Sequence, residues 1–199
     1  MSDFEGNFVV VEGIDGSGTT TLCNNLREDL GSDWEFTQEP SNGKYGRIVR
    51  EELQSESDPT LSDFFLFCAD RYDHNESLIG PILDSGKNVI TDRYNLSTYA
   101  YQTPVVDEAI DVDGVYYIKR ILDQFVFEPD LTIYLDIPME ESMTRVDDDR
   151  EKYENKKVLE QARVFYKHYA RVKPYVETVD ATQDIQTVTE ESLRYIEEL

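Results

Sequence analysis

The sequence predicts an α/β fold in which a five-stranded parallel sheet carries helices on both faces. Three observations predict it. Short β-branched or aromatic runs alternate with longer segments of helical spacing. Polar residues gather directly after four of the expected strands, and a glycine-rich segment follows the first strand. Parallel sheets bind ligands beyond the carboxyl ends of their strands, so these polar clusters mark the expected site.

The first expected elements are a strand over 8–11, a helix over 22–30, a strand over 34–37 and a helix over 45–53. The run FVVV at 8–11 is continuous and β-branched, which is typical of a strand covered on both faces. The segment LCNNLREDL at 22–30 has its apolar residues at helical spacing and ends at Gly31.

A long helical region is expected over 61–86, with an interruption near Gly80 and Pro81. A strand over 88–94 follows it and ends in a polar cluster. The remaining expected elements are a strand over 131–137, a helix over 139–146, an amphipathic helix over 158–172, a strand over 176–181 and a helix over 185–198. A chain of 199 residues without repeats or a low-complexity linker predicts one domain over 1–199.

The net charge of −23 excludes partners that need a basic surface, namely nucleic acid and anionic membranes. The acids are dispersed along the chain, as suits a protein that works in high salt, where charges are screened within a few ångströms. We therefore expect a halophilic source, with an ordinary acidic protein as the alternative.

The sequence shows neither a signal peptide pattern nor an apolar run long enough to span a membrane, so we expect a cytoplasmic protein. Cys23 and Cys68 lie in apolar helical patterns and are predicted to be buried free thiols.

The glycine-rich segment after the first strand matches the phosphate-binding loop pattern G-x-x-x-x-G-K-[ST], except that a threonine replaces the lysine. Glycines let the backbone turn successive N–H groups inward around phosphate oxygens, and the following helix adds the positive end of its dipole. We therefore predict an ATP phosphate-binding loop. Its expected contacts are Gly13, Ile14, Asp15, Gly16, Ser17, Gly18, Thr19, Thr20 and Thr21.

Thr19 occupies the lysine position of this pattern and carries no charge. The lysine offsets charge on the β- and γ-phosphates, and losing such a contact in a preorganised site costs on the order of a hundredfold in rate. Either another cation takes this role or catalysis is weak. Arg145 and Arg150 are candidates, because a polar segment over about 145–155 between two helices is typical of a lid that closes on phosphate.

Two further stretches carry chemistry. In FLFCADR (65–71), Phe67 and Arg71 lie one helical turn apart, which suits stacking on a base and binding its polar edge. Taken alone, this pair fits a core phenylalanine and a surface arginine equally well. In DRYNLSTYAYQ (92–102), directly after a strand, Asp92 can hold Mg²⁺ and Arg93 can bind phosphate through two hydrogen bonds.

Together these segments resemble the thymidylate kinase (dTMP kinase) family, in the P-loop nucleoside monophosphate kinase group. The similar segments, which cover nearly the whole chain, are EGIDGSGTTT, TQEP with YGRIVREEL, LFCADR, DRYNLSTYAYQ, PDLTIYLDIPMEESMTR and VDAT. The resemblance implies a three-layer P-loop NTPase fold with a lid. It also implies direct transfer of the ATP γ-phosphate to dTMP in dTTP biosynthesis, the use of Mg²⁺, and a homodimer packed through helices.

The resemblance also implies roles for matching residues. The metal would be held by Thr20 and Asp92. Thymine would stack on Phe67, and Tyr101 would crowd the 2′ position to favour deoxyribose. The implied dTMP site comprises Asp15, Glu39, Phe67, Arg71, Arg93, Ser97, Thr98 and Tyr101. The implied catalytic set comprises Asp15, Asp92, Arg93, Arg145 and Arg150, and Tyr153 and Glu154 would follow the lid near the acceptor.

The chain departs from the family pattern at Thr19 and at Gln38, where an arginine is usual. Nearby cations that can compensate for Gln38 are Lys44, Arg47 and Arg50. Gly16 follows Asp15 as in the family arrangement whose lid supplies the catalytic arginine. We hypothesise that Arg150, with Mg²⁺ on Thr20 and Asp92, replaces the lysine; a K⁺ ion bound at Thr19 is the alternative.

Two other functions stay open from the sequence. One is a related kinase that acts on dUMP or on a nucleoside. The other is a nucleotide-binding regulator, or pseudo-kinase, that has lost catalysis with its lysine. Four remaining residues are expected to be structural: His74 and His168 as satisfied core or surface, and Tyr166 and Tyr169 as packing residues.

Overall fold

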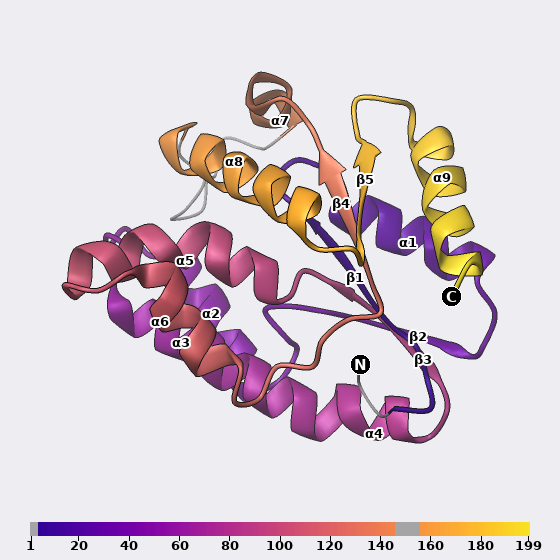
Figure 1. Ribbon diagram of the computed structural model, residues 1–199, viewed down its shortest axis with the longest axis horizontal. Helices are drawn as coiled ribbons and strands as arrows, with labels where there is room; N and C mark the ends of the chain where they lie inside the picture. Colours follow the sequence, from indigo (N-terminus) through magenta and orange to yellow (C-terminus); the bar gives the residue numbers. More distant parts are fainter. Residues whose placement is uncertain (1–3, 146–155) are drawn as a thin grey trace.

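The computed structural model describes residues 4–145 and 156–199. Within them, five parallel strands form one sheet with the order β2-β3-β1-β4-β5, and helices cover both faces (Figure 1). The strands are β1 (Phe8–Gly13), β2 (Trp34–Gln38), β3 (Asn88–Asp92), β4 (Leu131–Asp136) and β5 (Val176–Asp180). The predicted α/β class and the five predicted strands are confirmed.

The helices form two layers, with α1 and α9 on one face of the sheet and α4, α5 and α8 on the other. Outside α5 lie α3 and α6, and α2 packs on α3. The helical elements are α1 (Thr19–Asp29), α2 (Lys44–Leu53), α3 (Leu61–His74), the π-helical turn η1 (Asn75–Ile79), α4 (Gly80–Asp84), α5 (Asn95–Ala109), α6 (Gly114–Leu122), α7 (Met139–Arg145), α8 (Lys156–Val172) and α9 (Ile185–Glu197).

The helices differ from the sequence prediction in three places. First, α1 begins at Thr19 rather than at 22, because Gly18 takes a left-handed conformation that lets the helix start directly after the loop. Second, the interruption in 61–86 lies at the π-helical turn, just before Gly80, whose N–H bonds the carbonyl of Asn75. The ring of Pro81 is then accommodated at the start of α4.

The third difference is a pair of helices, α5 and α6, in a region where the sequence predicted no element. Helix α5 packs against α3, α6, α8 and β1, so its buried residues do not follow a single face. It also carries Pro104 within its length. These two properties hide the helix from a search for amphipathic spacing.

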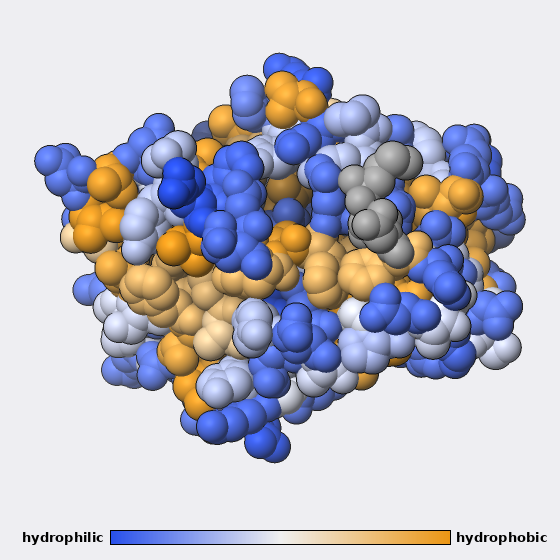
Figure 2. Space-filling model, turned by 60° about the horizontal axis from the view of Figure 1, so that its bottom comes forward, coloured by the Kyte–Doolittle hydropathy of each residue, from blue (hydrophilic) through white to orange (hydrophobic). Residues whose placement is uncertain are grey.

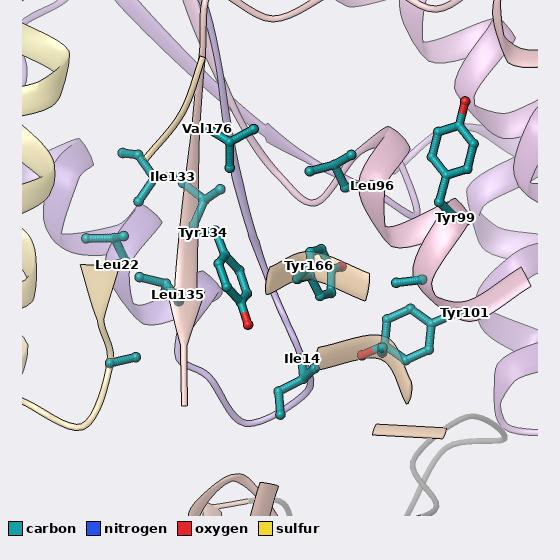
Figure 3. Close-up of a cluster of buried hydrophobic side chains, with 14 of the residues drawn as sticks. Ile14, Leu22, Leu96, Tyr99, Tyr101, Ile133, Tyr134, Leu135, Tyr166 and Val176 are labelled. Carbon is teal, nitrogen blue, oxygen red and sulfur yellow. The ribbon is translucent and has the colours of Figure 1, made fainter. Parts of the chain in front are cut away.

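The core lies on both faces of the sheet. Each residue of β1 is buried, with Val9 and Val11 in one cluster and Phe8 and Val10 in a second. The larger cluster joins the sheet to helices on both sides (Figure 3).

Cys23 and Cys68 are buried free thiols, as predicted, and burial raises the pKa of Cys68 to about 11. Among the helices of the described ranges, none is long and apolar enough to cross a membrane.

Substitution of Gly46 tests the packing of α2 against the segment before it. A Cβ at Gly46 would lie 2.0 Å from the Ser41 carbonyl oxygen and 2.6 Å from the Ser41 amide nitrogen. Ser41 cannot move away freely, because its N–H and Oγ both bond the buried Asp70 carboxylate. We expect Gly46→Ala to lower the free energy of unfolding by about 1–3 kcal/mol, although alanine favours helices.

Urea denaturation of both proteins measures this effect. Gly31→Ala is the matched control, because a Cβ there meets open space, and it should change the free energy of unfolding by no more than about 0.5 kcal/mol. A stabilised Gly46→Ala variant would show that helix propensity outweighs the clash.

Candidate active site

The loop between β1 and α1 has the geometry of a phosphate cradle. Gly16 and Gly18 both take positive φ angles, 75° and 96°, which glycine adopts without a steric penalty. The N–H of Ser17 bonds back to the carbonyl of Ile14 at 3.0 Å, which tightens the loop. At Gly13 a Cβ would lie 2.4 Å from Ser17 Oγ, so glycine is required there too. The loop thus directs its backbone toward a cavity at the start of α1.

This first cavity, the donor cavity, lies between the loop and the carboxyl ends of β4 and β5. Its lining residues are Asp15, Gly16, Ser17, Gly18, Thr19, Thr20, Thr21, Arg93, Leu135, Arg145, Ala181, Gln183, Ile185 and Val188. Arg145 reaches it from α7, where its guanidinium donates to the Ala181 carbonyl at 3.2 Å and to Glu141 at 2.6 Å. Of the predicted loop residues, Gly13 and Ile14 do not line this cavity.

Thr19 is buried, with 6% of its surface exposed, and supplies no charge. Within the described ranges, the charged side chains that line the donor cavity are Asp15, Arg93 and Arg145. Arg150, which the sequence reading assigned to the lysine's role, lies outside the described residues, as do Tyr153, Glu154 and the rest of the predicted lid after Arg145.

Thr20 and Asp92 meet beside the loop, where the threonine hydroxyl donates to Asp92 Oδ2 at 2.6 Å. The other carboxylate oxygen, Oδ1, is buried and has no hydrogen-bond partner among the described residues. A hydroxyl and a partly unsatisfied carboxylate suit Mg²⁺, which takes one or two protein oxygens and completes its shell with water and phosphate. The described residues contain no group of three acidic, histidine or cysteine side chains that would make a fuller metal site.

A second cavity, the acceptor cavity, lies between α3, α5 and the segment after β2. Its lining residues are Asp15, Glu39, Pro40, Leu53, Phe67, Arg71, Arg93, Tyr94, Ser97, Thr98, Tyr101 and Gln102. The structure therefore brings together all eight residues that the sequence reading assigned to dTMP. The reading missed four others, Pro40, Leu53, Tyr94 and Gln102, because the resemblance assigned them no role.

Arg71 is held rigidly at the floor of the acceptor cavity. It is 2% exposed and donates to Glu39 through Nε at 2.9 Å and Nη2 at 2.5 Å, and to Thr98 through Nη1 at 2.6 Å. Burial acts to raise the pKa of Glu39, but the Arg71 charge and the neighbouring His74 outweigh it, so this pKa lies below that of an ordinary glutamate. The pair is therefore ionised at neutral pH.

The two predicted structural histidines differ in position. His74 is buried, with Nδ1 3.2 Å from Glu39 Oε1 and Nε2 2.7 Å from Thr37 Oγ1, so it is a satisfied core residue as expected. His168 is exposed on α8, which the prediction also allowed.

Asp15 and Arg93 lie at the boundary of the two cavities and line both. Arg93 Nη2 bonds Asp15 Oδ1 at 2.5 Å, and Nη1 donates to the Gly13 carbonyl at 2.8 Å. The Tyr101 hydroxyl donates to the other Asp15 oxygen at 2.9 Å. Burial, reinforced by the Asp15 charge, raises the pKa of Tyr101, so the hydroxyl keeps its proton.

Gln38, at the position where the family usually has an arginine, does not line the acceptor cavity. Gln38 is exposed and lines a separate cleft beside His74 rather than the acceptor cavity. Lys44 and Arg47 are exposed, and Arg50 donates to the Pro40 carbonyl at 2.6 Å. These three cations do not line the acceptor cavity either, and their compensation for Gln38 stays a prediction.

Two buried residues that the sequence reading passed over support the site. Ser142 on α7 donates to the Asp15 carbonyl at 2.6 Å and so joins α7 to the phosphate loop. Glu12 on β1 accepts hydrogen bonds from Tyr94, Ser97 and Tyr166. The available signal for Glu12 was an acidic residue inside a strand that is otherwise continuously apolar. Ser142 had no such signal.

Replacement of Arg71 tests whether its pairing with Glu39 holds the acceptor cavity together. Arg71→Leu leaves the Glu39 carboxylate buried without its main partner, which we expect to cost about 3–5 kcal/mol of unfolding free energy at pH 7. Because the pKa of Glu39 is lowered by Arg71, its stabilising contribution is present above the unfolded-state pKa and is lost as pH falls through the folded-state pKa. In the variant, the Arg71 charge no longer opposes the effect of burial, so the pKa of Glu39 rises.

The difference between the two proteins should therefore shrink as pH falls from 7 to below 4.5, the ordinary pKa of glutamate, because Glu39 takes up a proton first in the variant and then, below 4.5, in the natural chain. Urea denaturation across this pH series measures it, with the exposed Arg47→Leu as control, for which we expect a change within about 0.5 kcal/mol. A difference that does not vary with pH would contradict the assigned ion pair.

Comparison with known proteins agrees with this geometry. A family model described as thymidylate kinase matches residues 11–192. The "Probable thymidylate kinase" of Natronomonas pharaonis is 35% identical over 194 residues, which cover 96% of this chain and 97% of that protein. The protein of the same name from Methanoculleus marisnigri is 39% identical over 169 residues, 83% of this chain and 82% of its own.

Among solved structures, the thymidylate kinase of Candida albicans matches with a TM-score of 0.83 and 24% identity, covering 99% of this chain and 93% of that one. This likeness concerns the fold and confirms the predicted P-loop kinase architecture. The family model and the relatives, with the resemblance of the motifs, lead to one conclusion. The chain belongs to the thymidylate kinase family.

Proposed function

We propose that this protein transfers the γ-phosphate of ATP to dTMP and forms dTDP and ADP. The observation that carries the proposal is the pair of adjoining cavities that share Asp15 and Arg93. One is built on a phosphate loop, and the other is lined by an aromatic ring and a fixed arginine. The thymidylate kinase family and the names of the relatives support the same reaction.

The reaction is a direct displacement, because adjoining sites allow both nucleotides to bind at once. An oxygen of the dTMP phosphate attacks the γ-phosphorus of ATP, the bond from that phosphorus to the ADP oxygen breaks, and the negative charge leaves on ADP. Arg93 lies at the junction where these phosphates meet. Its guanidinium, now shared between Asp15 and Gly13, is placed to bind the acceptor phosphate.

The acceptor cavity favours a pyrimidine deoxynucleotide. Phe67 lines one side and offers a ring on which a base can stack. Glu39, Thr98 and the Tyr94 carbonyl engage four of the five N–H donors of Arg71. Arg71 is therefore fixed in place and can offer its remaining Nη1 N–H to the base at little entropic cost. Tyr101 is held against Asp15 and narrows the space near the sugar, where a ribose 2′-hydroxyl would need room. Assays with dTMP, dUMP, the ribonucleotide of thymine and the nucleoside thymidine distinguish a dTMP kinase from a kinase that acts on dUMP, on ribonucleotides or on nucleosides.

Thr20 and Asp92 would hold Mg²⁺, which offsets phosphate charge during transfer when bound. The remaining charge that the lysine would supply must come from elsewhere. We keep Arg150 as the first candidate for this role on sequence grounds, since it lies outside the described residues, and a K⁺ ion at Thr19 as the second.

Steady-state formation of dTDP from ATP, dTMP and Mg²⁺ tests the proposal, with this chain and its Thr19→Lys variant compared in multi-molar KCl. High salt suits the acidic composition, and relatives are known in halophilic archaea. If another cation has replaced the lysine, the natural chain turns over and Thr19→Lys changes kcat by less than about threefold. If nothing replaced it, Thr19→Lys should raise kcat on the order of a hundredfold.

A natural chain that binds dTMP but forms no dTDP until lysine is restored would contradict the proposed activity. The protein would then be a nucleotide-binding regulator whose loop kept its shape and lost its catalysis. Replacement of KCl by NaCl at the same concentration is the control for a K⁺ requirement.

We also propose that the protein forms a homodimer through the outer face of α3. Phe65 and Tyr72 lie two turns apart on this helix and are 46% and 53% exposed. Tyr72 makes an edge-to-face contact with Phe125, which extends the apolar surface. Figure 2, which views the molecule from the side of α3 and α4, shows apolar side chains gathered amid a hydrophilic surface. Such contiguous apolar patches are uncommon on monomers and typical of interfaces.

Light scattering after gel filtration measures the assembly. We expect a mass of twice the 23.1 kDa chain for the natural protein, and a monomer for Phe65→Glu, because a charge buried in the proposed interface would have no partner. Val172→Glu is the control, since Val172 is 58% exposed on a different helix and should leave the dimer intact. A monomeric natural protein would contradict the proposal.

A further inference from the structure

The Glu12 carboxylate is buried in β1, on the face of the sheet that carries α5 and α8. It has no exposed surface. Its Oε1 accepts the backbone N–H groups of Tyr94 and Ser97 at 3.0 and 3.1 Å. Its Oε2 accepts the Ser97 hydroxyl at 2.6 Å and the Tyr166 hydroxyl at 2.9 Å. Four donors around one carboxylate compensate a burial that would otherwise be costly.

This arrangement caps α5 from outside the helix. The residue at the cap position, Tyr94, makes no side-chain cap of its own. The N–H of Ser97, in the first turn of α5, instead bonds Glu12 from 85 residues away. A carboxylate at a helix N-terminus satisfies free N–H groups and meets the positive end of the dipole. Burial raises the pKa of Glu12, and the bonds from Ser97 act against this rise.

The capped turn is the part of the molecule that carries the acceptor residues. Arg93 precedes it, Ser97 and Thr98 lie within it, and Tyr101 is one turn further along. Glu12 also directly precedes Gly13, whose carbonyl accepts a hydrogen bond from Arg93. The same carboxylate therefore fixes the acceptor turn relative to the first residue of the phosphate loop.

Tyr166 of α8 also binds the Glu12 carboxylate and so connects a third element to β1 and α5. Its ring stacks on Tyr134 of β4, with 5.2 Å between ring centroids, and lies between β4 and α5 (Figure 3). Its hydroxyl reaches both Glu12 and Ser97, the latter at 2.9 Å. Because the Ser97 hydroxyl donates to Glu12, its proton is engaged within the protein rather than directed at a nucleotide.

We propose that Glu12 is a positioning residue for the acceptor half of the site. The length of its side chain, rather than its charge, sets the distance between the first turn of α5 and the phosphate loop. The proposal rests on the proposed function, in which the acceptor is dTMP. Glu12 does not line either cavity, so it acts through Arg93, Ser97 and Tyr101.

Two variants distinguish the effect of side-chain length from the effect of charge. Glu12→Gln keeps the length of the side chain. The amide oxygen of the glutamine can accept both backbone N–H groups, and its NH2 group can donate to the Ser97 and Tyr166 hydroxyls, which can rotate to accept. Glu12→Asp keeps the charge but withdraws the carboxylate by one methylene. The measurements are KM for dTMP, KM for ATP and kcat, together with calorimetric binding of dTMP and a thermal melt to confirm folding at the assay temperature.

We expect Glu12→Asp to raise KM and the dissociation constant for dTMP about tenfold or more, because misplacement by about 1 Å costs up to a hundredfold. KM for ATP should change less than about threefold, and Glu12→Gln should keep all values within about threefold of the natural chain. A lower melting temperature alone would not produce this split between the two substrates.

Three results would overturn the proposal. Loss of dTMP affinity in Glu12→Gln, with or without a loss in Glu12→Asp, would assign the effect to charge. Equal changes in KM for ATP and dTMP would assign it to the general folding of the loop. Unchanged values in both variants would leave Glu12 without a role in the site. If the natural chain itself fails to bind dTMP, the proposed function has failed, independently of Glu12.

Discussion

The contact of Arg93 with Asp15 and Gly13 is the interaction on which the rest of the site depends, because it joins the phosphate loop to the acceptor segment. Arg93 has a φ of 69°, a left-handed conformation that costs a non-glycine residue on the order of 1–3 kcal/mol. It is held there by its N–H, which bonds the Val11 carbonyl at 2.8 Å, and by its guanidinium. The register of β1 against β3, which pairs Val11 with Asp92, places these groups opposite each other.

The same arrangement clarifies what the threonine at position 19 changes and what it leaves intact. The cradle itself depends on backbone geometry at Gly16 and Gly18 and on the start of α1, none of which involves a lysine side chain. What is missing is a positive charge close to the transferring phosphate, a catalytic contribution larger than most single hydrogen bonds. Binding of nucleotide and rate of transfer are therefore separable properties in this chain.

Much of the fold and the cavities was predictable from the sequence, because strands with continuous apolar runs end in polar residues and their carboxyl ends must share one edge. Helix α5 was not, since its burial on several sides removes the amphipathic spacing that identifies a helix. The partners of Glu12 were not either: they lie 82 to 154 residues away, and local sequence does not encode such a separation. The effect of Gln38 could not be read from local sequence either: its side chain is exposed and lines another cleft, and the loss of a phosphate contact there stays a prediction.

The central claim is that donor and acceptor nucleotides bind at once, in cavities that meet at Asp15 and Arg93. Calorimetric titration with a bisubstrate compound, in which adenosine and thymidine are joined by a chain of phosphates, tests this claim most directly. Two linked groups that fill adjoining sites bind far more tightly than either alone. The account predicts one such molecule per chain, an affinity at least a hundredfold above that of ATP or dTMP, and displacement by both nucleotides. An affinity no higher than that of one nucleotide, or displacement by only one of them, would contradict it.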